Sequence, residues 1–252
     1  MTAMRFLLFG FLLTMSTVGL VNAQQAYERA AIKRGNDLVA REQYEAAIRE
    51  YERVTPDAGE FYAQALYNIG VCHYELWHTD RAIDFYSRAI KAANNNYPRA
   101  SYALGVVLED RDRFAEAARA YQQSITHSRG YFSPAQFRLG LLKLRAGDNT
   151  SAARLFKEAT RRAGDHLPAS HNNLGVALAW MGRFSEAEDQ FKTALQLTGG
   201  RMKDAGQNLK LCQSLLRGVA ITSVRSSWLL VPDINSPRTA KNTDEDTNRV
   251  ND

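Results

Sequence analysis

Glycine recurs at one fixed spacing along most of this chain, and that spacing constrains the fold more than any other feature. Five glycines lie 35 residues apart, five alanines follow them by twelve residues, and five aromatic residues follow them by sixteen. A repeat of this length is the signature of a stacked array, which builds a long surface and favours binding over chemistry. The three sets are Gly35, Gly70, Gly105, Gly140 and Gly175; Ala47, Ala82, Ala117, Ala152 and Ala187; and Tyr51, Tyr86, Tyr121, Phe156 and Phe191.

Each repeat contains two amphipathic stretches. In the third repeat, apolar residues recur with helical periodicity over 100–109 and again over 114–125, and a short charged stretch, 110–113, separates them. This pattern predicts an antiparallel helical hairpin. Glycine inside a helix costs about 1 kcal/mol relative to alanine, so its recurrence predicts that two backbones approach closely beside the aromatic ring.

The repeat resembles the tetratricopeptide repeat (TPR) family, whose signature is W-x2-L-G-x2-Y, then A-x3-F, then P. The Leu-Gly pair stands here as Ile69-Gly70, Leu104-Gly105, Leu139-Gly140 and Leu174-Gly175, and the A-x3-F pair joins the alanines above to the aromatic residues. The sequence departs from the family at Arg34 before the first glycine, at the missing tryptophan, and in the position of proline. The resemblance covers about residues 28–201.

The resemblance implies an all-α fold, a right-handed α-solenoid of five TPR helix-turn-helix repeats. The spacing of Asn208-Leu209 after Asn173-Leu174 adds a C-terminal capping helix, which protects the last core face of a solenoid. The expected segments are a signal peptide, 1–23; the solenoid, 24–217, with repeats at about 28–61, 63–96, 98–131, 133–166 and 168–201 and the capping helix at 202–217; and a disordered tail, 218–252.

The N-terminus carries the pattern of a secretory signal peptide. One positive charge, Arg5, precedes an apolar stretch over 6–21, and Val21-Asn22-Ala23 places small residues where a signal peptidase reads. We expect cleavage after Ala23 and export of a bacterial-type protein, which is then periplasmic or secreted. An uncleaved membrane anchor is the alternative, although the apolar stretch is short for a span of about 20 residues.

In an exported protein, two cysteines could form a disulfide and a positive net charge is not expected to meet nucleic acid. Cys72 and Cys212 lie four repeats apart, which predicts a separation above about 30 Å, far beyond disulfide reach, and hence two unpaired core thiols. The net charge of +5 is spread among acidic residues. Nucleic acid is therefore not an expected partner, whereas another protein or peptide is.

In the TPR family the first helix of each pair lines the concave face, and the resemblance implies the same here. Tyr67, Tyr102 and Phe137 would then form an aromatic ladder for a bound peptide; the alternative is that they pack within the array. Some family members hold a partner's C-terminal carboxylate with a five-residue clamp. Asn36, Asn68 and Arg99 stand at three of its places, while Ile32 and Ala103 occupy the other two.

The residues five positions after the repeat glycines differ in charge and size, and we expect them to determine which partner this groove binds. They are Glu75, Asp110, Arg145 and Trp180, with Arg138 as a further basic residue beside them. Alternating charge fixes the register of a bound chain. Ordinary solvated charge is the other interpretation.

The helical spacing ends after Gly218, and the remaining composition is typical of a disordered tail. Trp228-Leu229-Leu230-Val231-Pro232 is too apolar for a simple linker. Four interpretations stay open: docking on the array, occupation of the groove, a motif for a partner, and disorder.

Catalytic patterns are missing from the sequence. The five histidines lack zinc-protease spacing, and neither a phosphate-binding glycine loop nor a nucleophile elbow is present. We therefore expect no enzyme, no cofactor and no metal, and a protein–protein interaction scaffold that binds a partner peptide or helix in its concave groove in the cell envelope. The alternative is a membrane-anchored structural assembly factor that uses the flank of the solenoid.

Overall fold

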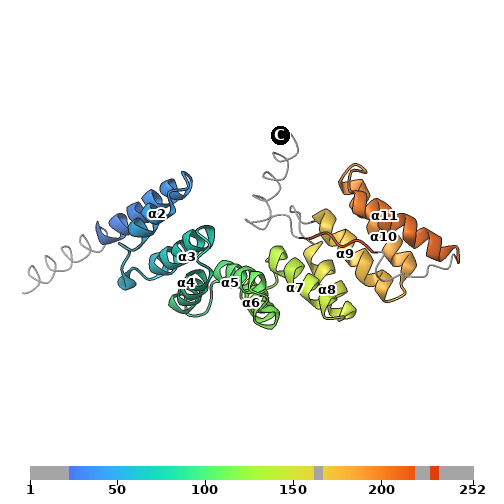
Figure 1. Ribbon diagram of the computed structural model, residues 1–252. Helices are drawn as coiled ribbons and strands as arrows, with labels where there is room; N and C mark the ends of the chain where they lie inside the picture. Colours follow the sequence, from blue (N-terminus) through green and yellow to red (C-terminus); the bar gives the residue numbers. More distant parts are fainter. Residues whose placement is uncertain (1–22, 162–166, 219–227, 233–252) are drawn as a thin grey trace, which may run out of the picture. The chain divides into compact units, whose positions relative to one another are not determined.

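The computed structural model describes residues 23–161, 167–218 and 228–232 (Figure 1). The secondary structure of these residues is helical, without a strand among them, as predicted. The chain forms two compact units, an N-terminal unit up to Val107 and a C-terminal unit from Leu108. The predicted signal peptide lies outside the described residues except for Ala23. No helix in the described ranges is both long and apolar enough to cross a membrane.

The N-terminal unit stacks helical hairpins. Residues 23–39 are helical, and they precede α2 (Tyr44–Tyr51), the short 3₁₀ helix η1 (Pro56–Ala58), α3 (Glu60–Glu75) and α4 (Thr79–Ala92). Helix α3 packs against both α2 and α4. The unit ends within α5 (Pro98–Asp110).

The C-terminal unit continues the hairpins with α6 (Phe114–His127), α7 (Ser133–Arg145), α8 (Asn149–Ala159), α9 (Leu167–Trp180) and α10 (Phe184–Leu197). Each of these helices from α7 on packs against the one before it. Helix α11 (Lys203–Leu216) closes the unit at the place predicted for the capping helix, and it packs against α10 and α9. Its Lys203 and Lys210 are exposed, while Ala205 and Cys212 are buried.

The 35-residue spacing has a direct packing cause. A Cβ atom on Gly70 would lie 2.7 Å from the Tyr86 ring, and one on Gly140 would lie 2.8 Å from the Phe156 ring. Gly175 and Phe191 repeat this relation at 2.5 Å, and Gly35 lies equally close to Tyr51. Only glycine lets the two helices of a hairpin approach this far. All five alanines of the repeat are fully buried, so the predicted close packing is confirmed within these hairpins.

The turns follow the same spacing in their backbone conformation. Between the two helices of each hairpin, one residue adopts a positive φ: Glu42, Trp77, Asp112, Gly147 and Gly182. The following residue donates its N–H to a carbonyl five residues earlier, as His78 does to His73 and Arg183 to Leu178, both at 2.9 Å. This is the hydrogen bond of a Schellman motif, which ends the first helix at a fixed residue.

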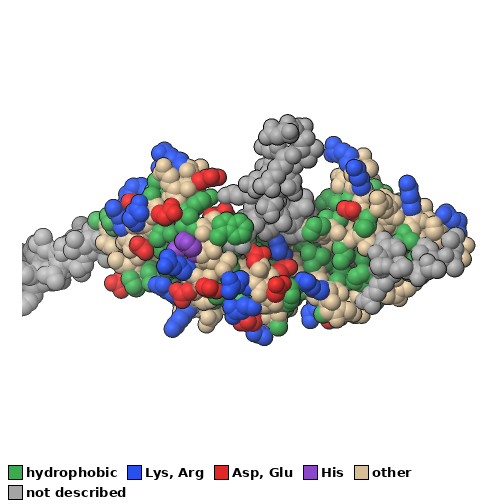
Figure 2. All heavy atoms as spheres, in the orientation of Figure 1, with side chains coloured by type: hydrophobic (Ala, Val, Ile, Leu, Met, Phe, Trp, Pro, Cys, Tyr) green, Lys and Arg blue, Asp and Glu red, His purple; other side chains and the backbone are tan. Residues whose placement is uncertain are grey.

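Both cysteines are free and buried, as expected for core residues. Burial raises the pKa of the Cys72 thiol to about 12 and that of the Cys212 thiol to about 11. On the face shown in Figure 2, basic and acidic side chains are interspersed rather than segregated. Several opposite charges among the described residues pair three or four positions apart, as Arg183 does with Glu186 at 2.7 Å.

Candidate functional site

A short segment of the chain's own C-terminal part lies against the C-terminal unit. Trp228–Pro232 is described without helix or strand, and in Figure 1 it crosses α9, with which it forms hydrogen bonds. This placement differs from the expected disordered tail for these five residues. Docking on the array, one of the four interpretations left open above, describes these five residues.

Asparagine side chains bind the backbone of this segment. Asn173 on α9 donates its Nδ2 to the Val231 carbonyl at 2.8 Å and accepts the Val231 N–H on its Oδ1 at 2.9 Å. Asn208 on α11 forms the same reciprocal pair with Leu229, at 2.8 Å in both directions. The two bonded residues are two apart, which is the period of an extended chain. Each asparagine therefore acts towards the segment as a neighbouring strand would.

Asn172 links the two reciprocal pairs. Its Nδ2 donates to the Leu229 carbonyl at 3.0 Å and to Asn173 Oδ1 at 3.1 Å, while its own Oδ1 accepts from Asn208 at 2.9 Å. All three asparagines are fully buried beneath the segment. A buried amide without a partner costs about 1 to 3 kcal/mol. The segment thus supplies hydrogen-bond partners to a row of three buried asparagines beside an apolar cluster.

Two side chains of the segment anchor it in the core. Trp228 is 5% exposed and its ring stacks on Phe191, with centroids 5.8 Å apart and planes 15° apart. Val231 is 7% exposed and belongs to the same apolar cluster. The indole Nε1 of Trp228 is buried and has no hydrogen-bond partner among the described residues. The anchors are therefore held by apolar packing, and the backbone is held by asparagines.

The predicted aromatic ladder is distributed over both units. Tyr67 is half-buried against Tyr97 and Tyr86, with ring centroids 5.5 and 5.7 Å away, and burial raises its pKa although the charge of Arg99 opposes this. Tyr102 is half-buried in the same N-terminal unit. Phe137 differs from the expectation of an open contact residue, because it is fully buried, edge-on to Phe156. It belongs to the apolar cluster that includes Trp228 and Val231.

The two asparagines of the predicted clamp do come together in the N-terminal unit. Asn68 donates to Asn36 Oδ1 at 3.2 Å, and the Tyr51 hydroxyl donates to the same oxygen at 2.8 Å. Arg99 is exposed. Asn68 occupies the same position in its repeat as Asn173 and Asn208, two residues before the repeat glycine position.

The side chains predicted to set specificity have varied surroundings. Glu75 and Trp180 are half-buried, and Trp180 packs against the apolar cluster of the C-terminal unit. Asp110 is exposed, and the exposed Arg145 places its guanidinium 4.1 Å from the Phe114 ring centre. The expectation for Arg138 is wrong: it is buried and bonded to Glu109 at 3.2 Å, so it is no open basic residue of the predicted groove.

The sequence analysis missed Asn172, Asn173, Asn208 and Phe191 as contact residues. For Asn173 and Asn208 the available signal was an asparagine at one position of the 35-residue spacing, shared by two repeats and the capping helix, and at these two residues it served only to locate the capping helix. Polar residues at a position that the helical pattern assigns to a buried face need partners. Asn173 and Asn208 meet that requirement through the backbone of Val231 and Leu229.

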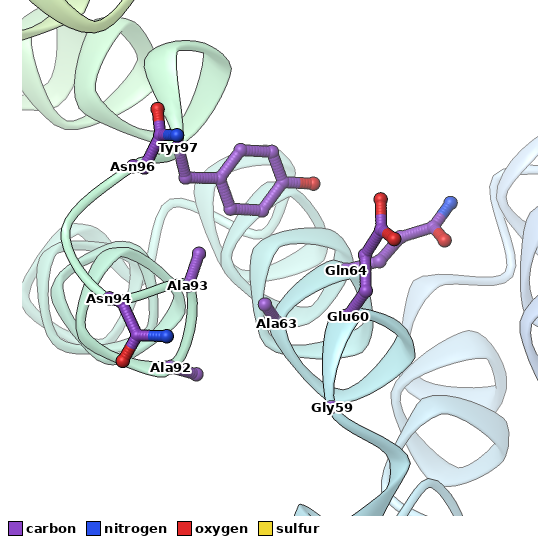
Figure 3. A pocket seen from close by; sticks show the side chains of 9 residues that line it. All are labelled: Gly59, Glu60, Ala63, Gln64, Ala92, Ala93, Asn94, Asn96 and Tyr97. Atoms are coloured by element: carbon purple, nitrogen blue, oxygen red, sulfur yellow. The ribbon is translucent and has the colours of Figure 1, made fainter.

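A second hollow, of about 530 Å³, lies in the N-terminal unit (Figure 3). It is lined by the first turn of α3 and by the end of α4 with the turn after it. Tyr97 points across it toward Glu60 and Gln64 in Figure 3, and burial raises the pKa of Tyr97 to about 12. None of the residues predicted for the groove lines this hollow. Within the described ranges, no cluster of His, Cys, Asp or Glu has the makings of a metal site.

Comparisons with known proteins agree with this architecture. A family profile described as tetratricopeptide repeat matches residues 32–97 and 137–201. The chain belongs to the tetratricopeptide repeat family. A search of curated proteins found no match.

Several solved structures share the fold of this TPR protein. A crystal structure of MamA protein matches with a TM-score of 0.57 at 20% identity, over 70% of this chain and 94% of that one. A MamA fragment from Desulfovibrio magneticus RS-1 matches with 0.56 at 17% identity, over 70% and 97%. YrrB, described as a TPR protein with an unusual peptide-binding site, matches with 0.54 at 22% identity, over 68% and 87%. Proteins built from these repeats generally act as non-catalytic interaction scaffolds.

Proposed function

We propose that this protein is a protein–protein interaction scaffold that binds an extended segment of a partner in the C-terminal unit. The observation that carries the proposal is the set of five hydrogen bonds between the side chains of Asn172, Asn173 and Asn208 and the backbone of Leu229 and Val231. The asparagines donate three of these bonds and accept two. We name the surface formed by these asparagines and Phe191 the asparagine groove.

The chemistry of the asparagine groove suits a peptide. Asparagine offers both a donor and an acceptor, so one side chain pairs with the N–H and the C=O of one peptide residue. Such contacts are available on any extended chain, while apolar pockets select side chains. The chain's own segment shows both kinds of contact at once. The description of YrrB as peptide-binding supports the same use of this fold here.

We also propose that the protein acts in the cell envelope, as a periplasmic or secreted protein. The support is the pattern of charge, apolar stretch and small residues up to Ala23. N-terminal sequencing of the protein from the native host tests this. A mature N-terminus at Gln24 is expected, whereas a retained Met1 supports the anchored alternative.

A peptide titration tests the binding function. The probe is a fluorescein-labelled peptide with the sequence of Ser226–Asp233, and the receptor is the full chain with Trp228→Ala and Val231→Ala, which removes both anchors of its own segment. Saturable binding is expected. Adding Asn173→Ala and Asn208→Ala removes four hydrogen bonds of about 0.5 to 1.5 kcal/mol each, so affinity falls at least about tenfold.

Asn68→Ala is the matched control, because Asn68 has the same repeat position but lies in the N-terminal unit. It is expected to leave the affinity unchanged. Undiminished binding after loss of Asn173 and Asn208 contradicts the assignment of the asparagine groove.

A further inference from the structure

The docked segment has a defined pattern of buried and exposed side chains. Trp228 and Val231 are buried, Leu229 is half-buried, and Leu230 is 36% exposed. Pro232 is exposed as well. The segment therefore buries a large aromatic residue and, three positions later, a branched aliphatic residue.

Pro232 adds preorganisation to this pattern. A residue before proline is restricted to extended backbone conformations. Val231 is that residue, and it needs an extended conformation to exchange both of its hydrogen bonds with Asn173. The proline thus reduces the conformational entropy that the segment loses on docking.

The covalent connection gives the segment an advantage over any free peptide. Nine residues separate Gly218, just after α11, from Trp228. Short connections of this kind give effective concentrations of about 1 mM. A partner has to compete with a segment that is always present at this concentration.

On the basis of the function proposed above, we propose that Trp228–Pro232 is a built-in competitor for the asparagine groove. The partner carries an extended segment of the same pattern: a large aromatic residue, two variable residues, a branched aliphatic residue and proline. Partner binding displaces the chain's own segment from α9 and α11.

Affinities of three full-length receptors for the labelled Ser226–Asp233 peptide test this. A segment that binds in trans with a Kd of about 10 to 100 µM reduces the apparent affinity for the probe about 10- to 100-fold when it is tethered at about 1 mM. The Trp228→Ala, Val231→Ala chain should therefore bind the probe 10- to 100-fold more tightly than the wild type. Leu230→Ala, which alters an exposed side chain, should bind like the wild type.

The outcomes separate this inference from the proposed function. Equal affinity of the wild type and the double variant overturns the competition but leaves peptide binding intact. An absence of binding to all three receptors overturns both. Pro232→Gly provides a milder variant that leaves the anchors in place, and it should give an intermediate affinity.

Two further measurements test the residue pattern of the bound segment and whether the segment docks on its own chain. Probes with alanine at the Trp228 or Val231 place should bind at least tenfold more weakly, and alanine at the Leu230 place should change little; the reverse order overturns the proposed pattern. Sedimentation should show that wild type and double variant have the same mass. A wild-type dimer that dissociates in the double variant overturns the intramolecular assignment, because the segment would then occupy a second copy.

Discussion

Asn173 and Val231 exchange two hydrogen bonds, at 2.8 and 2.9 Å, across 58 positions of sequence. Both partners are buried, and the contact is made to backbone atoms only on the side of the segment. Such a contact selects an extended backbone conformation of the segment rather than particular side chains. Selection is then left to Trp228 and Val231, whose side chains enter the apolar cluster beside Phe191.

Amide hydrogen exchange should reveal this contact in the protein without any partner. The N–H groups of Leu229 and Val231 are bonded to Asn208 and Asn173, and bonded, buried amides exchange slowly. We expect protection at both residues. In the Asn173→Ala, Asn208→Ala variant, exchange at both amides should accelerate at least about tenfold, measured by NMR.

Asn68→Ala serves as the control here too, with unchanged protection at Leu229 and Val231. Rapid exchange of these two amides in the wild type would show that the segment is not docked in solution.

The repeat glycines should be intolerant of a single methyl group. A Cβ at Gly175 would lie 2.5 Å from Phe191, whose ring is fully buried and cannot move aside freely. Gly175→Ala is expected to destabilise the protein by about 1 to 3 kcal/mol through overpacking, measured by urea unfolding.

Gly206→Ala is the matched comparison, because a Cβ there meets only Leu195, at 3.9 Å. Since Gly206 lies within α11, alanine should stabilise the helix by up to about 1 kcal/mol. Equal effects of the two substitutions would contradict the packing explanation of the 35-residue spacing.

The spacing predicted the helices and their pairing because packing imposes it. A stable hairpin of this kind needs a glycine facing the aromatic ring, as Gly70 faces Tyr86. The constraint is therefore visible in the sequence. The contact with Trp228–Pro232 is different, because Asn173 and Asn208 meet a segment that no periodicity connects to them. The position of this segment depends on hydrogen bonds from α9 and α11 to Leu229 and on the stacking of Trp228 against Phe191 of α10. For the same reason a solvated position was expected for Arg138, whose partner Glu109 lies 29 residues away.

The positive-φ turn residues predict opposite effects of glycine and alanine at equivalent positions. Glu42 is exposed and has φ 57°, which strains any residue with a side chain, whereas Gly182 has φ 76° in the equivalent turn. Glu42→Gly should stabilise by about 0.5 to 1 kcal/mol. Gly182→Ala should destabilise by about 1 to 2 kcal/mol, although nothing lies within 4 Å of its Cβ position.

Thermal or urea unfolding of the two variants checks both signs. Two changes of the same sign would show that the backbone conformation is not what limits these turns.

Alkaline pH should destabilise the protein through its buried thiols. Burial raises the pKa of Cys72 to about 12 from its usual value near 9. The folded chain therefore keeps this proton, whereas the unfolded chain loses it above about pH 9. The stabilising contribution is complete below pH 9 and is lost as the pH rises towards 12, by at most about 1.4 kcal/mol per pH unit for one thiol.

The comparison with Cys72→Ala reports this thiol together with its charge effect on Tyr51 and Tyr86, whose pKa values it helps to raise, whereas the pKa of Tyr97 is raised by burial and by other neighbours. Urea unfolding between pH 8 and about pH 11 should show a steeper fall in the free energy of unfolding for the wild type. The same burial should make Cys72 slow to react with a disulfide reagent at pH 8 in the folded state, since the thiolate is the reactive form. Parallel pH profiles of wild type and variant would mean that Cys72 ionises as readily in the folded as in the unfolded chain.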